Sequence, residues 1–152
     1  MFHLRHLLLG VSTAALLAGA AAAKDDITVG LQLEPPHLDP TSAAAGAIDS
    51  VLYSNVFEGL TRFDSAGAVI PGLAKSWEIS EDGLTYTFTL NEAVTFHDGS
   101  TMDAEDVKFS LDRIGAEDSA NAQKALYTAI TEVNVIDPTT VEIKLSEANG
   151  NM

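Results

Sequence analysis

A strictly alternating stretch, LTYTFTL at residues 84–90, constrains the fold more than any other part of the chain. Its apolar side chains recur at every second position with threonines between them, which is the pattern of a strand with one buried face. The apolar positions are Leu84, Tyr86, Phe88 and Leu90. The turn signal Glu81-Asp82-Gly83 precedes the stretch, and Trp77 and Ile79 alternate with polar residues before that turn. We therefore predict an antiparallel hairpin here.

A helix is predicted shortly after this hairpin. Apolar residues recur there at intervals of three and four, the spacing of a helical face turned towards a core. They are Ala104, Val107, Leu111 and Ile114. Asp103 is placed to cap the start of the helix, and Glu105 and Asp106 fall in its first turn, where the helix dipole favours negative charge.

Further turns and hairpins are predicted from local signals. Residues 133–145 alternate on both sides of Asp137-Pro138-Thr139, which predicts a last hairpin. Asp64-Ser65-Ala66-Gly67 predicts a turn between two short strands. His97-Asp98-Gly99-Ser100 predicts another turn, after a short strand that ends at Thr95-Phe96.

The remaining segments complete a mixed architecture. Ile27–Leu33 alternates and predicts a strand with one buried face, and the proline-rich Glu34–Ala47 predicts a loop. Helical spacing predicts a helix from Ile48 to Phe57, ended by Gly59, and a second helix over Asn121 to Ile130. Elements in this order predict an α+β fold whose sheet is mainly antiparallel.

The first 23 residues have the pattern of a cleaved secretory signal peptide. Arg5 is followed by an apolar run from Leu7 to Leu17 and then by the small residues Ala21-Ala22-Ala23. The apolar run is well short of the roughly 20 residues that a membrane-spanning helix needs. We therefore exclude residues 1–23 from the fold and expect an exported protein.

Charge and cysteine content narrow the class of protein. The chain has 22 acidic and 8 basic residues, a net charge of −14, which argues against nucleic acid or an anionic membrane as a partner. The absence of cysteine excludes a disulfide framework, a thiolate metal site and a lipidated cysteine anchor. A soluble periplasmic protein is expected.

One stretch suggests chemistry: TFHDGSTMDAEDV, residues 95–107, holds one histidine and four carboxylates. The calcium-loop pattern fails because Gly99 directly follows Asp98, and the zinc pattern fails because His97 has no second histidine at helical spacing. No nucleophile motif or phosphate-binding loop is present. We predict no catalytic residue, metal or cofactor, although a hydrolase that uses Glu58 or Asp98 stays open as an alternative.

Three stretches carry a family resemblance. They are LDPTSAAAGAIDSVLYSNVFEGL (38–60), PGLAKSW (71–77) and SEDGLTYTFTLNEAVTFHDGSTMDAEDVKFSLDR (80–113). Their motifs, in this order and spacing, resemble the N-terminal part of the family 5 extracellular solute-binding proteins, which serve peptide, dipeptide and nickel ABC importers. The chain departs from the usual family pattern at Asn91-Glu92-Ala93 and at Met102, both in turns.

The resemblance implies a bilobed periplasmic-binding-protein fold of the type II cluster, with an extra domain. Residues 24–55 would begin the first lobe, and residues 56–152 would form an extra domain that is incomplete at its C-terminus. The chain would then be an N-terminal fragment, expected to act as a monomer and to meet ABC permease subunits in the inner membrane. Ligand capture by hinge closure is the implied mechanism.

The resemblance also implies a ligand-facing segment at Ala45, Gly46 and Ala47. Three small residues allow a peptide backbone to approach and to pair with main-chain groups. A flexible loop, or the first turn of the following helix, explains the same residues equally well. Asn121 to Gln123 fall where peptide-binding members bring the extra domain towards the pocket.

Other functions stay open at this point. A nickel chelate, a sugar or an opine could replace the peptide as the solute of the same fold. A secreted hydrolase with a carboxylate site, and a chaperone-like module that binds extended chains, are the alternatives from other classes.

Overall fold

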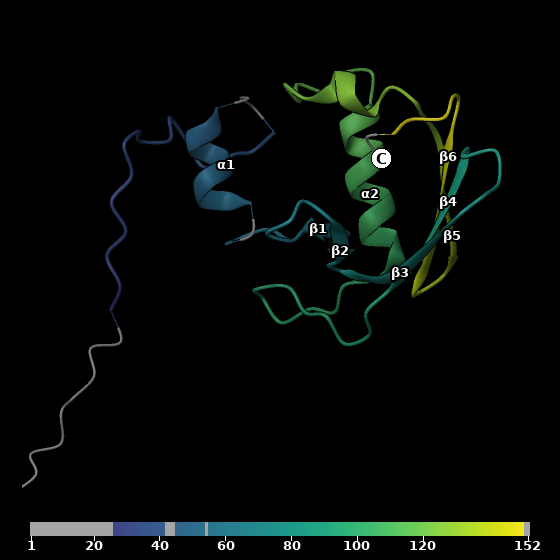
Figure 1. Cartoon of the computed structure of the whole chain (residues 1–152), viewed down its shortest axis with the longest axis horizontal. Coiled ribbons are helices and arrows are strands. Elements are labelled where there is room, and N and C mark those ends of the chain that lie inside the picture. Colours follow the sequence, from purple (N-terminus) through teal and green to yellow (C-terminus); the bar gives the residue numbers. More distant parts are fainter. Residues whose placement is uncertain (1–25, 42–44, 54, 151–152) are drawn as a thin grey trace, which may run out of the picture. The chain divides into compact units, whose positions relative to one another are not determined.

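The computed structural model describes residues 26–41, 45–53 and 55–150 (Figure 1). The chain divides into two units, Met1–Gly30 and Leu31–Met152. The predicted signal peptide lies outside the described residues, and the predicted lobe boundary between residues 55 and 56 stays a prediction. No helix in the described part of the chain is long and apolar enough to span a membrane.

The strand predicted over Ile27–Leu33 is wrong, since neither sheet of the described chain includes these residues. Ile27 is 88% exposed and Leu33 is 71% exposed. A strand is stable only where neighbouring strands pair its backbone and cover its apolar face. The alternating pattern is compatible with a strand, but in the described part of the chain no neighbouring strand pairs with this segment.

Four antiparallel strands form the main sheet, in the order β3-β4-β6-β5. The strands are β3 (Ala74–Ile79), β4 (Thr85–Leu90), β5 (Ile130–Asp137) and β6 (Thr140–Leu145). The hairpins predicted around Asp82 and Pro138 are confirmed, because β3 pairs with β4 and β5 pairs with β6. The two hairpins join through β4 and β6, where Phe88 pairs with Val141. The predicted α+β class with a mainly antiparallel sheet is confirmed.

A second, two-stranded sheet contains β1 (Thr61–Phe63) and β2 (Val69–Pro71). The predicted turn between them is confirmed. The Asp64 carboxylate accepts hydrogen bonds from the backbone N–H groups of Ala66, at 2.8 Å, and Ala68, at 2.9 Å. A single side chain therefore satisfies two donors that the turn leaves unpaired.

The predicted turn at residues 97–100 has the same construction. The Asp98 carboxylate accepts the Ser100 backbone N–H at 2.9 Å and the Ser100 hydroxyl at 2.7 Å. Gly99 has a φ of +86°, a conformation that glycine adopts at no steric cost. The short strand predicted before the turn is reduced to one bridge, between Thr95 and Thr101.

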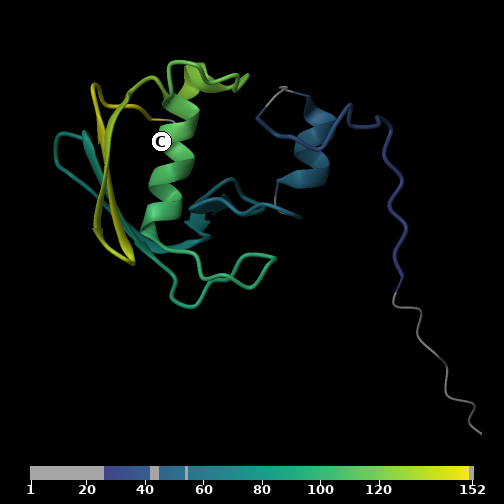
Figure 2. The same ribbon diagram turned by 180° about the vertical axis from the view of Figure 1, so that it is seen from behind.

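The longest helix, α2 (Ala104–Gly115), begins where the sequence predicts. The Asp103 carboxylate accepts the Glu105 N–H, and the Asp106 carboxylate accepts the Asp103 N–H, each at 2.9 Å. This reciprocal capping box satisfies orphan donors at the helix start. Figures 1 and 2 show α2 lying along one face of the main sheet, where it contacts β5 and β6.

The hydrophobic core lies between α2 and the main sheet. Its buried residues are Ala74, Tyr86, Phe88, Leu90, Ala104, Val107, Ala129, Val133, Val141, Ile143 and Leu145. The alternating residues of β4 and β6 supply most of them, as the two-residue period predicts.

Helix α1 (Gly46–Leu52) is shorter than the helix predicted to reach Phe57. The Asn55 side-chain amide donates to the Ser50 carbonyl at 3.2 Å, and Tyr53 has an extended backbone. Asparagine competes in this way for backbone groups that the helix would otherwise use. The helix therefore ends before the apolar spacing does.

The helix predicted over residues 121–130 is also wrong in extent. Only η1 (Lys124–Tyr127), one turn of 3₁₀ helix, forms there, and β5 starts at Ile130. Residues 130–135 include β-branched side chains at alternating positions, which suit a pleated sheet better than a helix.

Candidate functional site

The predicted ligand-facing residues Ala45, Gly46 and Ala47 lie at the start of α1. Ala45 is extended and its carbonyl accepts the Ile48 N–H at 2.8 Å, while Gly46 and Ala47 belong to the first turn. A Cβ placed on Gly46 would meet nothing within 4 Å. The backbone at Gly46 is therefore open to an approaching ligand.

The second predicted segment, residues 121–123, contacts the chain before α1. The Ala122 N–H donates to the Thr41 carbonyl at 3.0 Å. The Gln123 side chain lies near enough to the Tyr53 hydroxyl to oppose the rise in its pKa. Thr41 precedes α1 in the chain, so this hydrogen bond joins residues 121–123 to the segment before the helix.

Residues 121–123 are themselves fixed by local hydrogen bonds. The Asn121 side-chain oxygen accepts the Gln123 N–H at 2.7 Å, and the Ser119 hydroxyl accepts the Asn121 N–H at 3.3 Å. The Lys124 ammonium donates to the carbonyls of Ala116 and Glu117, just after α2. A cation at a helix C-terminus satisfies carbonyls that have no partner within the helix. The segment is thus anchored to the end of α2.

The hydroxyl of Tyr53 keeps its proton at neutral pH. Burial, and then the neighbouring Asp49 carboxylate, raise the pKa of Tyr53 above its usual value. The neutral phenol can donate or accept a hydrogen bond.

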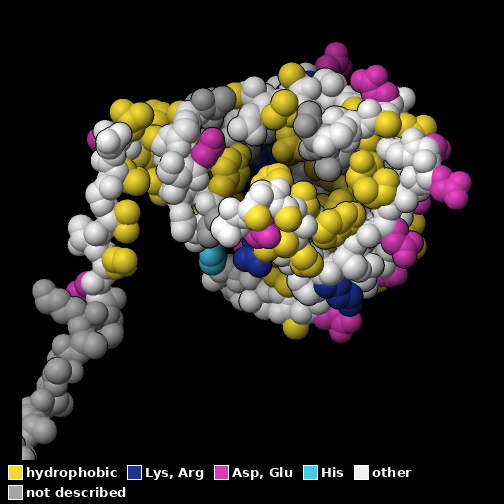
Figure 3. Space-filling model, in the orientation of Figure 1, with side chains coloured by type: hydrophobic (Ala, Val, Ile, Leu, Met, Phe, Trp, Pro, Cys, Tyr) yellow, Lys and Arg dark blue, Asp and Glu magenta, His cyan; other side chains and the backbone are white. Residues whose placement is uncertain are grey.

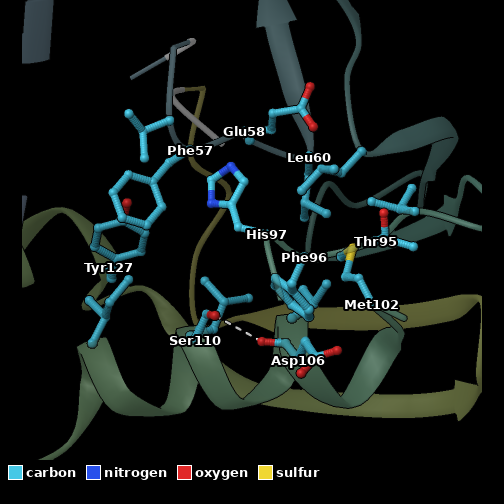
Figure 4. Close-up of a pocket in the computed structure, with 17 residues that line it drawn as sticks. Phe57, Glu58, Leu60, Thr95, Phe96, His97, Met102, Asp106, Ser110 and Tyr127 are labelled. Atoms are coloured by element: carbon cyan, nitrogen blue, oxygen red, sulfur yellow. Dashed lines mark hydrogen bonds between the residues drawn. The ribbon is translucent and has the colours of Figure 1, made fainter. Parts of the chain in front are cut away.

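An apolar groove of about 520 Å³ lies beside this region (Figure 4). Figure 3 also shows hydrophobic side chains gathered around a hollow on one face of the molecule. The apolar lining residues are Val56, Phe57, Leu60, Leu73, Val94, Phe96, Met102, Val107, Leu111 and Ile114. Tyr127 of η1 also lines the groove. Segments from residues 56–60, 94–97 and α2 build its walls.

The polar groups of the groove are few. Figure 4 shows Asp106 and Ser110 on α2, with His97 and Glu58 on the other side of the groove. The Ser110 hydroxyl donates to the Asp106 backbone carbonyl at 2.8 Å, and the Asp106 carboxylate caps α2. The Ser110 hydroxyl and the Asp106 carboxylate thus make hydrogen bonds within α2 and its cap. The groove is therefore suited to a ligand that makes apolar contacts.

The structure does not gather the carboxylates of residues 95–107 into a reaction centre. Asp103 and Asp106 cap α2, and Asp98 forms the turn described above. Hydrogen bonds from Ser100 lower the pKa of Asp98, so this carboxyl is ionised at neutral pH, unlike a general acid. In the described part of the chain, no three His, Cys, Asp or Glu side chains are grouped so that they could hold a metal ion.

Sequence reasoning missed Thr41. A signal for Thr41 was present, because Asp39-Pro40-Thr41 repeats as Asp137-Pro138-Thr139. In both turns the threonine N–H donates to the aspartate carboxylate at 2.8 Å, and the threonine hydroxyl donates to the same oxygen.

The chain belongs to the bacterial extracellular solute-binding proteins of family 5. Residues 68–152 match the family described as "Bacterial extracellular solute-binding proteins, family 5 Middle". The predicted family is therefore confirmed. Proteins of this family are described as binders of solutes.

Individual relatives agree with this assignment. The glutathione-binding protein GsiB of Escherichia coli (strain K12) is 38% identical over 141 residues, which covers 91% of this chain and 27% of GsiB. The chain thus spans about a quarter of the length of this curated relative.

Solved structures show the same fold. NikZ from Campylobacter jejuni, in complex with Ni(L-His), is 35% identical with a TM-score of 0.66, over 74% of this chain and 22% of NikZ. The oligopeptide-binding protein AppA from Bacillus subtilis, in complex with a nonapeptide, is 26% identical with a TM-score of 0.72, over 78% of this chain and 23% of AppA.

Proposed function

We propose that the protein carrying this chain is the periplasmic solute-binding subunit of an ABC importer, which captures peptides and delivers them to permease subunits in the inner membrane. Membership of the family is the observation that carries this proposal. A signal peptide over residues 1–23 would bring the protein to the periplasm, where it would act as a monomer without a cofactor.

Peptides are the solute class that the relatives favour. GsiB binds glutathione, a small modified peptide, and AppA holds a nonapeptide. The NikZ complex with Ni(L-His) makes a nickel chelate the second candidate within the same family. Closure of two lobes around the solute is the mechanism proposed for the whole protein.

Ala45, Gly46 and Ala47 are the residues proposed to meet the peptide. The open space at Gly46 supports this role, because a peptide backbone can approach where no side chain intervenes. Recognition through main-chain groups does not depend on which side chains the peptide carries, which suits a protein that binds many peptides.

Calorimetric titration of the full product of the gene tests the proposal. Glutathione, a dipeptide, a nonapeptide and Ni(L-His) are the probes, and saturable binding of at least one peptide is expected. Binding of Ni(L-His) without any peptide, or no binding of any probe, would overturn the peptide assignment. Hydrolysis of a bound peptide, abolished by Asp98→Asn or Glu58→Gln, would instead support the hydrolase.

A pair of glycine variants tests the ligand-facing segment. Gly46→Leu should weaken peptide affinity about tenfold or more, since a side chain would fill the open space and displace the ligand backbone. Gly115→Leu is the matched control, because Gly115 also lies in a helix with nothing within 4 Å of its Cβ position. Equal affinity of both variants would remove Gly46 from the site.

A further inference from the structure

The floor of the apolar groove is part of the hydrophobic core. Val107 belongs to the buried core and also lines the groove. Leu60, Met102 and Leu111, which line the groove as well, pack directly against the same core. The groove is therefore a side on which the core opens to solvent, and not a separate hollow in the surface.

The rim of the groove is apolar and exposed. Phe57 is 47% exposed and Phe96 is 46% exposed, and Figure 4 shows both beside the groove. Val56, next to Phe57, is exposed as well. A contiguous apolar surface of this kind marks an interaction site.

An extended peptide is poorly suited to this groove. Asp106 and Ser110 already make hydrogen bonds within α2 and its cap. A peptide backbone in the groove would find few partners for its N–H and C=O groups, and burying such groups without partners costs free energy. A helix or the face of a sheet satisfies its own backbone groups and brings only side chains, so it suits the groove better.

A second copy of this chain is also poorly suited. A symmetric dimer places the same surface patch of both subunits together. Two hollows that face each other would enclose empty space, and the atoms that line such a space lose packing contacts. Each copy also carries a net charge of −14, which opposes association.

The relatives indicate a third occupant. This chain covers only 27% of GsiB. NikZ shares the fold over 74% of this chain, and the match covers 22% of NikZ. Both relatives therefore carry this domain within a much longer polypeptide.

We propose that the part of the full protein that follows Met152 fills the groove with apolar side chains of a helix or a sheet face. The groove is then an interface inside the folded protein, with Phe57 and Phe96 buried in it. This inference goes beyond solute binding, and it holds whichever solute the protein captures.

Hydroxyl-radical footprinting of the full product of the gene tests whether the groove is covered, because the radicals oxidise exposed aromatic side chains. Phe57 and Phe96 report on the groove. Phe109, which is 68% exposed on α2, and Phe63 of β1 lie outside its lining and are the controls. Phe57 and Phe96 should react at least about tenfold more slowly than the controls, as expected in the core of an interface. Similar rates for all four would overturn the proposal.

Two further conditions identify the occupant. The footprint is repeated over about a hundredfold range of protein concentration, and with glutathione or a nonapeptide added. Protection that stays the same in all conditions supports the proposal. Protection that disappears on dilution would assign the groove to a second copy, and protection that requires a peptide would assign it to the solute. Failure of both peptides to bind would count against the proposed function and leave the footprint of the groove unchanged.

A variant pair tests the contact at Phe57. Phe57→Asp should make Phe96 react about 3- to 10-fold faster, because an unpaired charge opposes burial of the groove. Phe109→Asp is the matched control and should leave the rate at Phe96 unchanged. An unchanged rate in Phe57→Asp would overturn the docking at Phe57. The footprint of the parent protein decides the question if Phe57→Asp does not fold.

Discussion

Gly72 lies directly against the backbone of Gly59: a Cβ placed on Gly72 would stand 2.6 Å from the Gly59 carbonyl oxygen and 3.0 Å from that of Leu60. Gly72 donates its N–H to the Leu60 carbonyl at 3.1 Å, and Leu73 donates to the Gly59 carbonyl at 2.9 Å. This close approach places residues 59–60, which line the groove, against Gly72 and Leu73, directly before β3. Only a residue without a side chain fits here.

Gly72→Ala should therefore destabilise the protein by about 1–3 kcal/mol, because backbone atoms must move to admit the methyl group. Urea denaturation monitored by Trp77 fluorescence measures this. Gly115→Ala is the control and should be neutral or slightly stabilising, since its Cβ position is open. A neutral Gly72→Ala would show that the contact is not tight in solution.

Asp103→Ala should lower the free energy of unfolding by about 1 kcal/mol, because the start of α2 loses the acceptor for the Glu105 N–H. Asp103→Asn, which keeps a capping oxygen, should recover most of the loss. Thermal unfolding followed by circular dichroism compares the variants. Equal losses in both would mean that charge, and not the capping hydrogen bond, matters at this position.

Leu90→Ala should cost about 2–5 kcal/mol, since Leu90 is 1% exposed in the core and its truncation leaves a cavity. Leu126→Ala provides the contrast, because Leu126 is 68% exposed and should change stability by less than about 0.5 kcal/mol. Chemical denaturation of both variants is the measurement. Similar costs for the two would contradict the burial assigned to β4.

The free energy of unfolding should decrease at acidic pH, because Asp98 and Asp137 stabilise two turns only in their ionised form. Hydrogen bonds from Ser100 lower the pKa of Asp98, and hydrogen bonds from the backbone N–H of Thr139 and from threonine hydroxyls lower the pKa of Asp137. A carboxyl whose folded pKa is lowered stabilises the fold above its unfolded pKa, and this contribution is lost as pH falls through the folded pKa. The loss should therefore appear below the ordinary aspartate value of 3.8.

Denaturation curves between pH 7 and pH 2 measure this dependence. The double variant Asp98→Asn/Asp137→Asn should lose less stability on acidification than the parent, since asparagine keeps an accepting oxygen but does not titrate. Leu126→Ala, which changes an exposed side chain that does not titrate, is the control and should lose as much stability on acidification as the parent. An unchanged pH slope in the double variant would show that these turns do not contribute to acid sensitivity.

Local sequence patterns correctly predicted the helices and strands that are determined by contacts between neighbouring residues in the sequence. The β3–β4 hairpin and α2 followed from alternation, turn residues and the cap at Asp103, because neighbours in the sequence make those contacts. The extent of α1 did not follow, since the side chain of Asn55 rather than the apolar spacing ends it. Ile27–Leu33 has the pattern of a strand, but a pattern cannot reveal whether a partner strand is present.

The candidate ligand-facing segment stays a prediction, and it rests on family resemblance. Ala45, Gly46 and Ala47 are small residues that no physical rule marks as a site. The Thr41–Ala122 hydrogen bond joins backbone groups of two segments that are far apart in the chain, so the identities of the side chains do not predict it. The pairing of β4 with β6 is unpredictable for the same reason, since several strand orders bury the same alternating residues.

That pairing has a consequence for how the protein is made. Thr85 lies opposite Lys144 and Thr89 opposite Thr140, so the centre of the main sheet joins two strands that are separated in the chain by α2, η1 and β5. Two-stranded hairpins are only marginally stable alone, and closing a long loop slows folding. A chain that emerges one residue at a time therefore cannot complete the main sheet until Leu145 is available.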